Sequence, residues 1–533
     1  MDKPLPIGLQ SFEKLIRQDY LYIDKTAYIY QLVQPPTGVY FLHRPRRFGK
    51  SLLTSTLKAL FEGKRDLFAG LAISNTPYDF PEHPVIHLDF SQLLVTSSEA
   101  FTHSLTDYLL DIAQAHGISL PLTHSTNTPA LLRRLIRALA RQGSVVLLID
   151  EYDAPIINNL SPEKLDTAKA IREELKAFFA TIKASDAYLR FIFLTGISKF
   201  SKVGVFSGLN NLLDISMQTR YANLLGISQT ELERDFAAPI KALAQAHQVD
   251  ASDILEKIRY WYNGFCFTPN AETLYNPFSL LLLFDSRHFR HYWFQTATPS
   301  FLMEHLKQQQ VDVRRLEHLR LSETQFDSYD LEHLSLPTLL VQTGYLTITG
   351  VDAKDRYTLS YPNYEVRKAF LEHVYTHFSH HYQLKEPDLA DKLEDALHHL
   401  KWQRFINLFN SLLASIPYQL HDKDTEEQTP PKHENYYHSL FHATMSLLGQ
   451  PIASEVSTHR GRIDSVIHTP THIIIFEFKR DDDLDSAVKQ VSDKDYPKAY
   501  EHFDKPIFLV FIHFNSTLRQ IDAYKVLAPY TYS

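Results

Sequence analysis

The stretch 39–198 alternates short apolar runs with amphipathic helical patterns, and this alternation constrains the fold more than any other feature of the chain. Continuous apolar runs are typical of strands that helices cover on both sides of a parallel sheet. We therefore expect strands at residues 39–43, 85–90, 145–149 and 189–194. The pattern predicts an α/β domain with a parallel sheet between two helical layers.

The first expected strand leads into Arg44-Pro45-Arg46-Arg47-Phe48-Gly49-Lys50-Ser51 and then into a helical run, although the full phosphate-loop pattern has Gly where this chain has Arg44. A strand, a turn ending in Gly-Lys-Ser and a helix form a phosphate cradle, because backbone N–H groups bind the phosphate oxygens. We expect Lys50 to reach the β- and γ-phosphates of ATP and the Ser51 hydroxyl to bind Mg²⁺. The candidate nucleotide-binding residues of this loop are Arg46, Arg47, Phe48, Gly49, Lys50 and Ser51.

Two acidic residues, Asp150 and Glu151, follow the apolar run 145–149. Carboxylates at the end of a buried strand need a metal or a partner, because their burial alone is unfavourable. We expect Asp150 to bind Mg²⁺ and Glu151 to act as the catalytic base that orients the attacking water. The run 189–194 ends beside Thr195 and Ser198, and either hydroxyl is a candidate contact for the γ-phosphate or the water.

Three arginines, Arg44, Arg46 and Arg47, crowd the loop. Each arginine is a candidate to neutralise phosphate charge within its own subunit. Each could alternatively serve as an arginine finger in a neighbouring subunit, a role that implies a homo-oligomer. A solvated basic turn is the alternative.

The last hundred residues show a second pattern, after a polar segment at 421–433 that we interpret as a linker. We expect a helix at 434–448, strands at 452–456, 462–468 and 472–479, a helix at 484–503 and a strand at 506–514. Glu477 and Lys479 alternate with two phenylalanines, so both project from one face of their strand. If Asp464 on the neighbouring strand points the same way, Asp464 and Glu477 can hold Mg²⁺ against a scissile phosphate while Lys479 stabilises charge.

Gln490 and Glu434 are candidate accessory groups on the flanking helices, with a solvated helix face as the alternative for both. Residues 432–533 contain 11 Lys and Arg against 13 Asp and Glu, which opposes tight non-specific binding to nucleic acid by this part alone. Either another domain supplies a basic surface, or the substrate is small or limited to a single strand.

The chain of 533 residues is long enough for two or three domains, and its net charge of −8 is that of an ordinary globular protein. The single cysteine, Cys266, fits a reducing cytosol, and no apolar run approaches the ~20 residues that cross a membrane. Between the two α/β regions lies a helical region, in which a helix at 336–345 and strands at 345–349 and 356–361 are consistent with a winged helix. We expect a soluble cytoplasmic protein.

Stretches along nearly the whole chain resemble a predicted bacterial AAA-ATPase-like family whose members carry a C-terminal PD-(D/E)XK nuclease-superfamily domain. The 195–212 stretch is long and specific, and the loop Arg-Pro-Arg-Arg-Phe-Gly-Lys-Ser is usual in the family, which makes Arg44 a family feature. Similar proteins more often have Asp and Arg at the positions of Asn263 and Cys266. The matching segments are 6–8, 22–26, 44–51, 148–153, 195–202, 206–212, 275–279, 344–346, 461–464 and 476–479.

The resemblance implies an AAA-like P-loop NTPase domain at 1–228, a helical region at 229–385, a helix and linker at 386–431 and a PD-(D/E)XK nuclease-like domain at 432–533. It also implies ATP binding, ATP hydrolysis and a nuclease-type fold. We expect an ATP-dependent switch or motor that controls a Mg²⁺-dependent nuclease acting on nucleic acid. The alternative is a nucleotide-dependent regulatory or signalling protein whose C-terminal domain binds a partner without cleaving.

Overall fold

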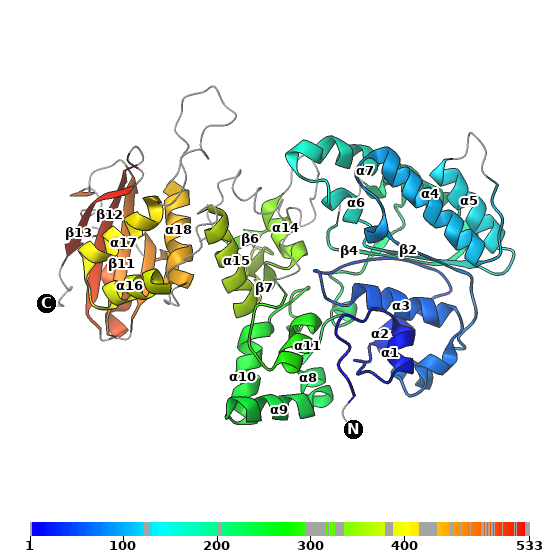
Figure 1. Ribbon diagram of the computed structural model, residues 1–533, viewed down its shortest axis with the longest axis horizontal. Coiled ribbons are helices and arrows are strands. Elements are labelled where there is room, and N and C mark those ends of the chain that lie inside the picture. The colour runs from blue at the N-terminus through cyan, green and yellow to red at the C-terminus, as the bar shows by residue number, and fades with distance from the viewer. Residues whose placement is uncertain are drawn as a thin grey trace. The chain divides into compact units, whose positions relative to one another are not determined.

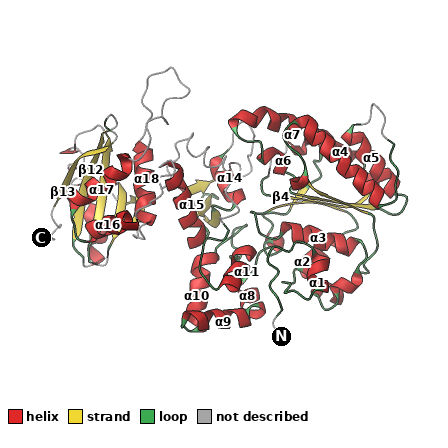
Figure 2. Ribbon diagram, viewed as in Figure 1, coloured by secondary structure: helices red, strands yellow, loops and turns green. Residues whose placement is uncertain are grey.

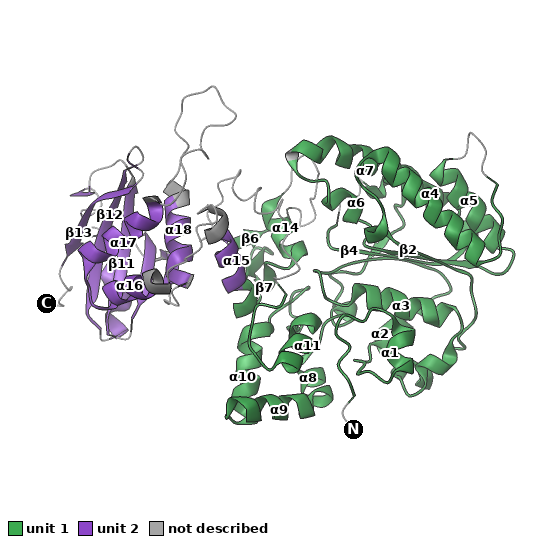
Figure 3. Cartoon of the chain, viewed as in Figure 1, with its two compact units in different colours: residues 1–297, 319–366 green, residues 298–318, 367–533 purple. Residues whose placement is uncertain are grey.

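The computed structural model describes most of the chain, in two compact units (Figure 3): residues 1–297 with 319–366, and residues 298–318 with 367–533. The described residues are 3–121, 127–199, 205–293, 316, 319–322, 325, 335–378, 387–414, 434–447, 452–458, 461–469, 471–480, 484–485, 488, 491, 494, 496–503, 505–515, 518 and 520–527. The expected linker at 421–433, Gln490 and the side chain of Glu434 lie outside them.

A five-stranded parallel sheet organises the first unit, in the order β2-β3-β4-β1-β5. The four strands expected from the apolar runs are confirmed, and the short β5 was not predicted. β4 lies between β1, which leads into the phosphate loop, and β3, which ends in the acidic residues. Because the three strands are parallel, their carboxyl ends lie at the same edge of the sheet. The strands are β1 (Gly38–His43), β2 (Val85–Asp89), β3 (Val145–Asp150), β4 (Leu189–Gly196) and β5 (Leu213–Asp214).

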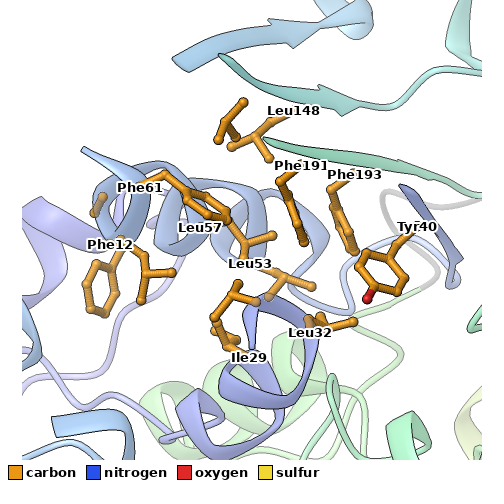
Figure 4. Close-up of a cluster of buried hydrophobic side chains, with 14 of the residues drawn as sticks. Phe12, Ile29, Leu32, Tyr40, Leu53, Leu57, Phe61, Leu148, Phe191 and Phe193 are labelled. Carbon is orange, nitrogen blue, oxygen red and sulfur yellow. The ribbon is translucent and has the colours of Figure 1, made fainter. Parts of the chain in front are cut away.

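Helices cover both faces of this sheet, as the sequence pattern predicted (Figure 1). On one face lie α4 (Ser98–Ala115), α5 (Thr128–Leu139), α6 (Ala154–Ile157) and α7 (Leu165–Ala184). On the other lie α1 (Phe12–Arg17), α2 (Thr26–Val33) and α3 (Lys50–Phe61). Figure 4 shows the core on this second face, where Leu53, Leu57 and Phe61 of α3 pack toward Phe191 and Phe193 of β4. Burial of these side chains holds the start of α3 beside the strand ends.

The remainder of the first unit is mostly helical (Figure 2). Its helices are α8 (Gln229–Asp235), α9 (Ala237–His247), α10 (Ala251–Tyr262), α11 (Pro277–Ser286) and α14 (Leu336–Thr343), whereas α15 (Tyr364–Phe378) belongs to it only up to Val366. The expected helix followed by an antiparallel hairpin is present as α14, β7 (Thr347–Val351) and β8 (Tyr357–Ser360). A third strand, β6 (Leu319–Leu321), pairs with β8.

The second unit contains a mixed five-stranded sheet in the order β13-β12-β11-β10-β9. The strands expected at 452–456, 462–468, 472–479 and 506–514 are confirmed, whereas β13 was not predicted. Of the expected helix at 484–503, the described part at Tyr496–Phe503 is a 3₁₀ helix. The strands are β9 (Ile452–Ser457), β10 (Arg462–His468), β11 (Ile473–Arg480), β12 (Ile507–Asn515) and β13 (Gln520–Leu527).

Aromatic packing fixes which face of the second sheet is which. Phe476 and Phe478 of β11 contact Phe441 of α18 (Glu434–Leu447), and Phe476 also contacts Phe405 of α17 (Trp402–Ala414). The helix α16 (Pro387–His398) packs against α17. Because side chains alternate along a strand, Glu477 and Lys479 project from the opposite face.

Among the described residues, no helix combines the length and the apolar composition needed to cross a membrane.

Candidate ATP site and candidate nuclease site

The phosphate loop connects β1 to α3 through a turn that only a glycine adopts easily. Gly49 immediately precedes α3 and has a φ of 92°, which is strained for residues with a Cβ. This conformation directs the first N–H groups of α3 toward the loop, where the helix dipole favours an anion. The local structure is therefore the phosphate cradle that the sequence predicted.

Lys50 lies within this cradle, and its Nζ donates to the carbonyl oxygens of Arg44 and Pro45, both at 3.0 Å. Burial lowers the pKa of Lys50, while Glu151 and Asp150 act in the opposite direction. The ammonium is thus held at the loop by carbonyl groups that a phosphate can replace.

Ser51 and Asp150 lie together, as expected for two groups that share a Mg²⁺ ion. A hydrogen bond from Ser51 lowers the pKa of Asp150, but burial dominates and raises that pKa to about 6. A divalent ion would favour the ionised carboxylate. The hydroxyl and carboxylate oxygens are also the ligand types that Mg²⁺ prefers, so these residues fit the ion.

Glu151 and Thr195 occupy the tips of the two neighbouring strands. Glu151 has a φ of 48°, and burial raises the pKa of its carboxyl group. Thr195 is fully buried, and its Oγ1 has no hydrogen-bond partner among the described residues. A buried hydroxyl without a partner costs about 1–3 kcal/mol, which makes Thr195 suited to a ligand that completes its hydrogen bonding.

Ser198, the second hydroxyl considered at this strand end, is engaged elsewhere. Its Oγ and its backbone N–H both donate to Asp153 at 2.6 Å, and the N–H of Ile197 donates to the same carboxylate. All three residues are buried. The structure therefore favours Thr195 over Ser198 as the group that faces a ligand, and it identifies Asp153 as the residue that holds the turn after β4. Sequence reasoning gave Asp153 no role, although it lies within a stretch that carries the family resemblance.

A cavity of about 440 Å³ adjoins the loop. All six candidate loop residues, Arg46 to Ser51, line it together with Glu151, whereas Asp150 and Thr195 do not. Two parts of the chain that sequence reasoning left without a role close the other sides: the N-terminal segment, through Pro6, Gly8 and Tyr22, and the helical region, through Ile227 and Phe278. The stretches 6–8 and 22–26, which carry the family resemblance, were the available signal.

The Arg44 side chain lies in the protein interior. It is fully buried, its Nη1 donates to the carbonyl oxygens of His43 and Ser216, and its guanidinium lies 4.1 Å from the centre of the Phe267 ring. Burial lowers the pKa of Arg44 to about 9. Arg44 does not line the cavity, so the structure favours Arg46 and Arg47 over Arg44 as phosphate contacts. Arg46 and Arg47 line the cavity and remain candidates.

The segment 262–267, where Asn263 and Cys266 replace the usual Asp and Arg, supports the phosphate loop. Phe265 and Phe267 contact Phe48 edge to face, with ring centres 4.9 and 5.2 Å apart. The thiol of Cys266 is buried and donates to the carbonyl oxygen of Thr268, while the Asn263 side chain accepts from the N–H of Gly264. Cys266 therefore lies between the two phenylalanines that support the loop, whereas the Asn263 side chain contacts its own neighbour, Gly264.

The carboxylates of the C-terminal domain meet on one face of its sheet. The register of β10 and β11 pairs Ser465 with Phe476, so Asp464 and Glu477 occupy the next opposed positions. Asp464 also accepts a hydrogen bond from the N–H of Phe478 at 2.9 Å. Burial raises the pKa of Glu477 to about 8, and the neighbouring charge of Asp464 adds to this rise while that of Lys479 opposes it.

These three groups fit a magnesium site. A divalent cation beside Asp464 and Glu477 would stabilise the ionised form of Glu477, whose pKa the charge of Asp464 raises. The described residues contain no cluster of three or more His, Cys, Asp or Glu side chains. Mg²⁺ commonly binds through one or two carboxylates, with water and substrate phosphate completing its shell, so two are sufficient.

The phosphate loop, the acidic strand and the intervening β4 define a P-loop NTPase of AAA type, joined in one chain to a nuclease-type α/β domain. The model of the predicted AAA-ATPase family matches residues 6–206, and that of the PD-(D/E)XK nuclease superfamily matches residues 432–524. The chain belongs to this family of predicted AAA-ATPases with a C-terminal PD-(D/E)XK nuclease-superfamily domain.

A relative supports this assignment over the full length. It is described as an uncharacterized protein in the vnfD 5′ region of Azotobacter chroococcum mcd 1, and it is 36% identical over 536 residues that cover 98% of this chain and 99% of its own. Among solved structures, the ORC2 protein of Aeropyrum pernix in ADPNP–ADP complexes matches with 10% identity and a TM-score of 0.22, over 67% of this chain and 92% of that one. A likeness at that TM-score carries no argument.

Proposed function

We propose that this protein binds and hydrolyses ATP, and that its nucleotide state controls a Mg²⁺-dependent nuclease in the C-terminal domain. The observation that carries the proposal is the pairing of the buried carboxyl group of Glu477 with the partly buried one of Asp464 on one sheet face, because two interacting carboxyl groups are costly in a protein that has no cation to put between them. Lys479 beside them supplies the positive charge that a cleaved phosphodiester requires.

The ATPase part of the proposal rests on Lys50, Ser51, Asp150, Glu151 and Thr195. Lys50 and the α3 N-terminus bind the phosphates, Ser51 and Asp150 hold Mg²⁺, and Glu151 at the cavity wall activates the water. Thr195 offers its hydroxyl to the γ-phosphate or the water. The cavity between the N-terminal segment and the helical region takes the nucleoside.

Calorimetry with ATP and Mg²⁺ tests the proposed ATP binding. Lys50→Ala should abolish binding, because it removes the mobile cation at the β- and γ-phosphates. Lys58→Ala is the matched control, since Lys58 lies on the same helix but is exposed and pairs with Glu62. Wild-type affinity in Lys50→Ala would refute the phosphate-loop assignment.

A cleavage assay tests the proposed nuclease activity. Its substrates are plasmid DNA, single-stranded DNA and RNA, and each is assayed in Mg²⁺ or EDTA, with and without ATP. We expect cleavage that requires Mg²⁺ and depends on ATP. If ATP is hydrolysed but no substrate is cut, the protein is instead a nucleotide-dependent switch whose C-terminal domain binds a partner. With one buried cysteine, the protein fits the reducing cytoplasm in either case.

A further inference from the structure

The end of α14 touches two loops of the ATPase domain that are far apart in sequence. α14 and the hairpin after it belong to the helical region, yet the end of α14 lies beside the phosphate loop and beside the turn that follows β4. All of these residues lie in the first compact unit.

The contact with the phosphate loop is made by Gly344, which ends α14 with a φ of 90°. A Cβ at this position would lie 2.7 Å from the Cβ of Pro45, so only glycine allows this approach. Trp293 holds the same loop, since its Nε1 donates to the carbonyl oxygen of Arg46 at 3.1 Å. The Trp293 ring in turn packs against Tyr345, the residue after Gly344.

The contact with the other loop is made by Gln342. Its Oε1 accepts a hydrogen bond from the backbone N–H of Lys199 at 3.1 Å, and the Gln342 side chain is only 3% exposed. On the near side of the same turn, Asp153 binds the N–H groups of Ile197 and Ser198. The backbone after Thr195 is therefore fixed at one end by the ATPase domain and at the other by α14.

We propose that Gln342 is a positioning residue for ATP hydrolysis, which acts by holding the turn that carries Thr195 in register with the phosphate loop. This inference rests on the proposed ATPase function. Asp153 and Tyr152 hold the start of the turn, whereas at its end the Lys199 side chain pairs with Asp214 and the Lys199 backbone N–H donates to Gln342 of α14. Because Gly344 sits two residues further along, a shift of the phosphate loop on nucleotide binding must also be accommodated at this helix end. Through α14, the helical region becomes part of the arrangement that orients the γ-phosphate.

The test measures ATP turnover and ATP binding separately in the full chain. Gln342→Leu removes the acceptor, and we expect kcat to fall by at least about 10-fold while the Kd for a non-hydrolysable ATP analogue with Mg²⁺ stays within about threefold. Gln342→Glu keeps an acceptor oxygen and should recover most of the lost turnover. Gln245→Leu, at an exposed position of α9, is the control. Unchanged kcat in Gln342→Leu, or an equal loss of affinity and kcat, would overturn the proposal.

Hydrogen exchange provides a second measurement, and its first readout uses the wild-type protein and needs no variant. In the wild-type protein, the Lys199 amide should exchange slowly, and Gln342→Leu should accelerate its exchange without affecting that of Ser198, which Asp153 binds. A Lys199 amide that exchanges at the rate of an exposed group in the wild type refutes the contact. This measurement also separates failure of the positioning role from failure of the proposed ATPase function. If the wild-type protein does not hydrolyse ATP, exchange of the Lys199 amide still reports whether the contact with Gln342 exists.

Discussion

At the residue scale, the ATP site is defined by groups that the protein leaves energetically unsatisfied. Asp150 and Glu151 have raised pKa values because they are buried, and the Thr195 hydroxyl has no partner among the described residues. Ser198 and Asp153, only a few residues away, satisfy one another. Burial raises the pKa of Asp153 as well, so the difference lies in hydrogen bonding. Asp153 has donors within the turn, whereas the Thr195 hydroxyl has no partner among the described residues, which supports our proposal that Thr195 contacts a ligand.

Glu151→Gln should separate hydrolysis from binding. The amide keeps the shape of the side chain but cannot accept a proton from water, so turnover should fall by about 100-fold or more while ATP remains bound. Steady-state turnover and calorimetry on the same preparation measure both effects. If turnover is unchanged, another residue activates the water.

Thr195→Val should affect catalysis without destabilising the fold. Valine has nearly the same shape and removes a buried hydroxyl that has no partner, so the free energy of unfolding should stay equal or rise by up to about 1 kcal/mol. ATP turnover should nevertheless fall in Thr195→Val, because the hydroxyl proposed to face the γ-phosphate is lost. Thr195→Ser keeps a hydroxyl and should retain the turnover. Denaturant unfolding and a turnover assay provide the two readouts. A large loss of stability would mean that the hydroxyl is satisfied within the protein.

At the scale of elements, the phosphate loop depends on parts of the chain more than two hundred residues away. Phe48 packs on Phe265 and Phe267, and Arg46 receives a hydrogen bond from Trp293. On the opposite side of the cavity, Lys25 of the N-terminal segment binds Glu231 of α8 with both oxygens at 2.7 Å, and both side chains are largely buried. Removing one partner of such a pair leaves a buried charge, so the cavity walls are held together by more than apolar contact.

Gly344→Ala should disturb the loop through this packing. The new Cβ meets Pro45, and the left-handed backbone adds a cost of about 1–2 kcal/mol, so both thermal stability and ATP affinity should decrease. Gly350→Ala is the matched control within β7, because a Cβ there has nothing within 4 Å. Thermal unfolding and calorimetry report the two effects. Equal behaviour of the two variants would show that the Gly344 contact is not tight in solution.

At the scale of the whole molecule, the two candidate sites lie in different compact units, each with its own sheet and core. The Lys50 site belongs to the parallel sheet of the first unit, and the Asp464 site to the mixed sheet of the second. The candidate residues of each site all come from one unit. A substitution at one site should therefore leave the activity of the other site unchanged.

Asp464→Ala and Lys479→Ala should each eliminate cleavage while ATP turnover stays within about twofold, because the substituted residues and the ATP site lie in different compact units. Asp464→Asn, which keeps the acceptor for the Phe478 N–H, separates loss of charge from loss of that hydrogen bond. Parallel cleavage and ATPase assays on each variant provide the check. Cleavage that persists in all three variants would exclude this site as the nuclease centre.

The sequence by itself determined the elements whose signals are local. Runs of consecutive apolar residues predicted the four main strands of the first sheet, and Gly49-Lys50-Ser51 predicted the turn before α3, because backbone conformation and strand burial follow from neighbouring residues. The alternation Phe476-Glu477-Phe478-Lys479 likewise predicted which side chains share a face of β11. In the same way, two strand-like runs at 345–349 and 356–361 predicted the hairpin after α14.

Only the tertiary structure decided which residues face a ligand. Arg44 looks like a phosphate-binding residue in the sequence, but packing against Phe267 buries it. Neither the closure of the cavity by the N-terminal segment nor the bond from Gln342 to Lys199 leaves a local pattern, since each joins residues that are not neighbours in the sequence. The strand β13 escaped prediction for a related reason: half of its residues are exposed, and its pairing with β12 defines it more than its own weak apolar pattern does.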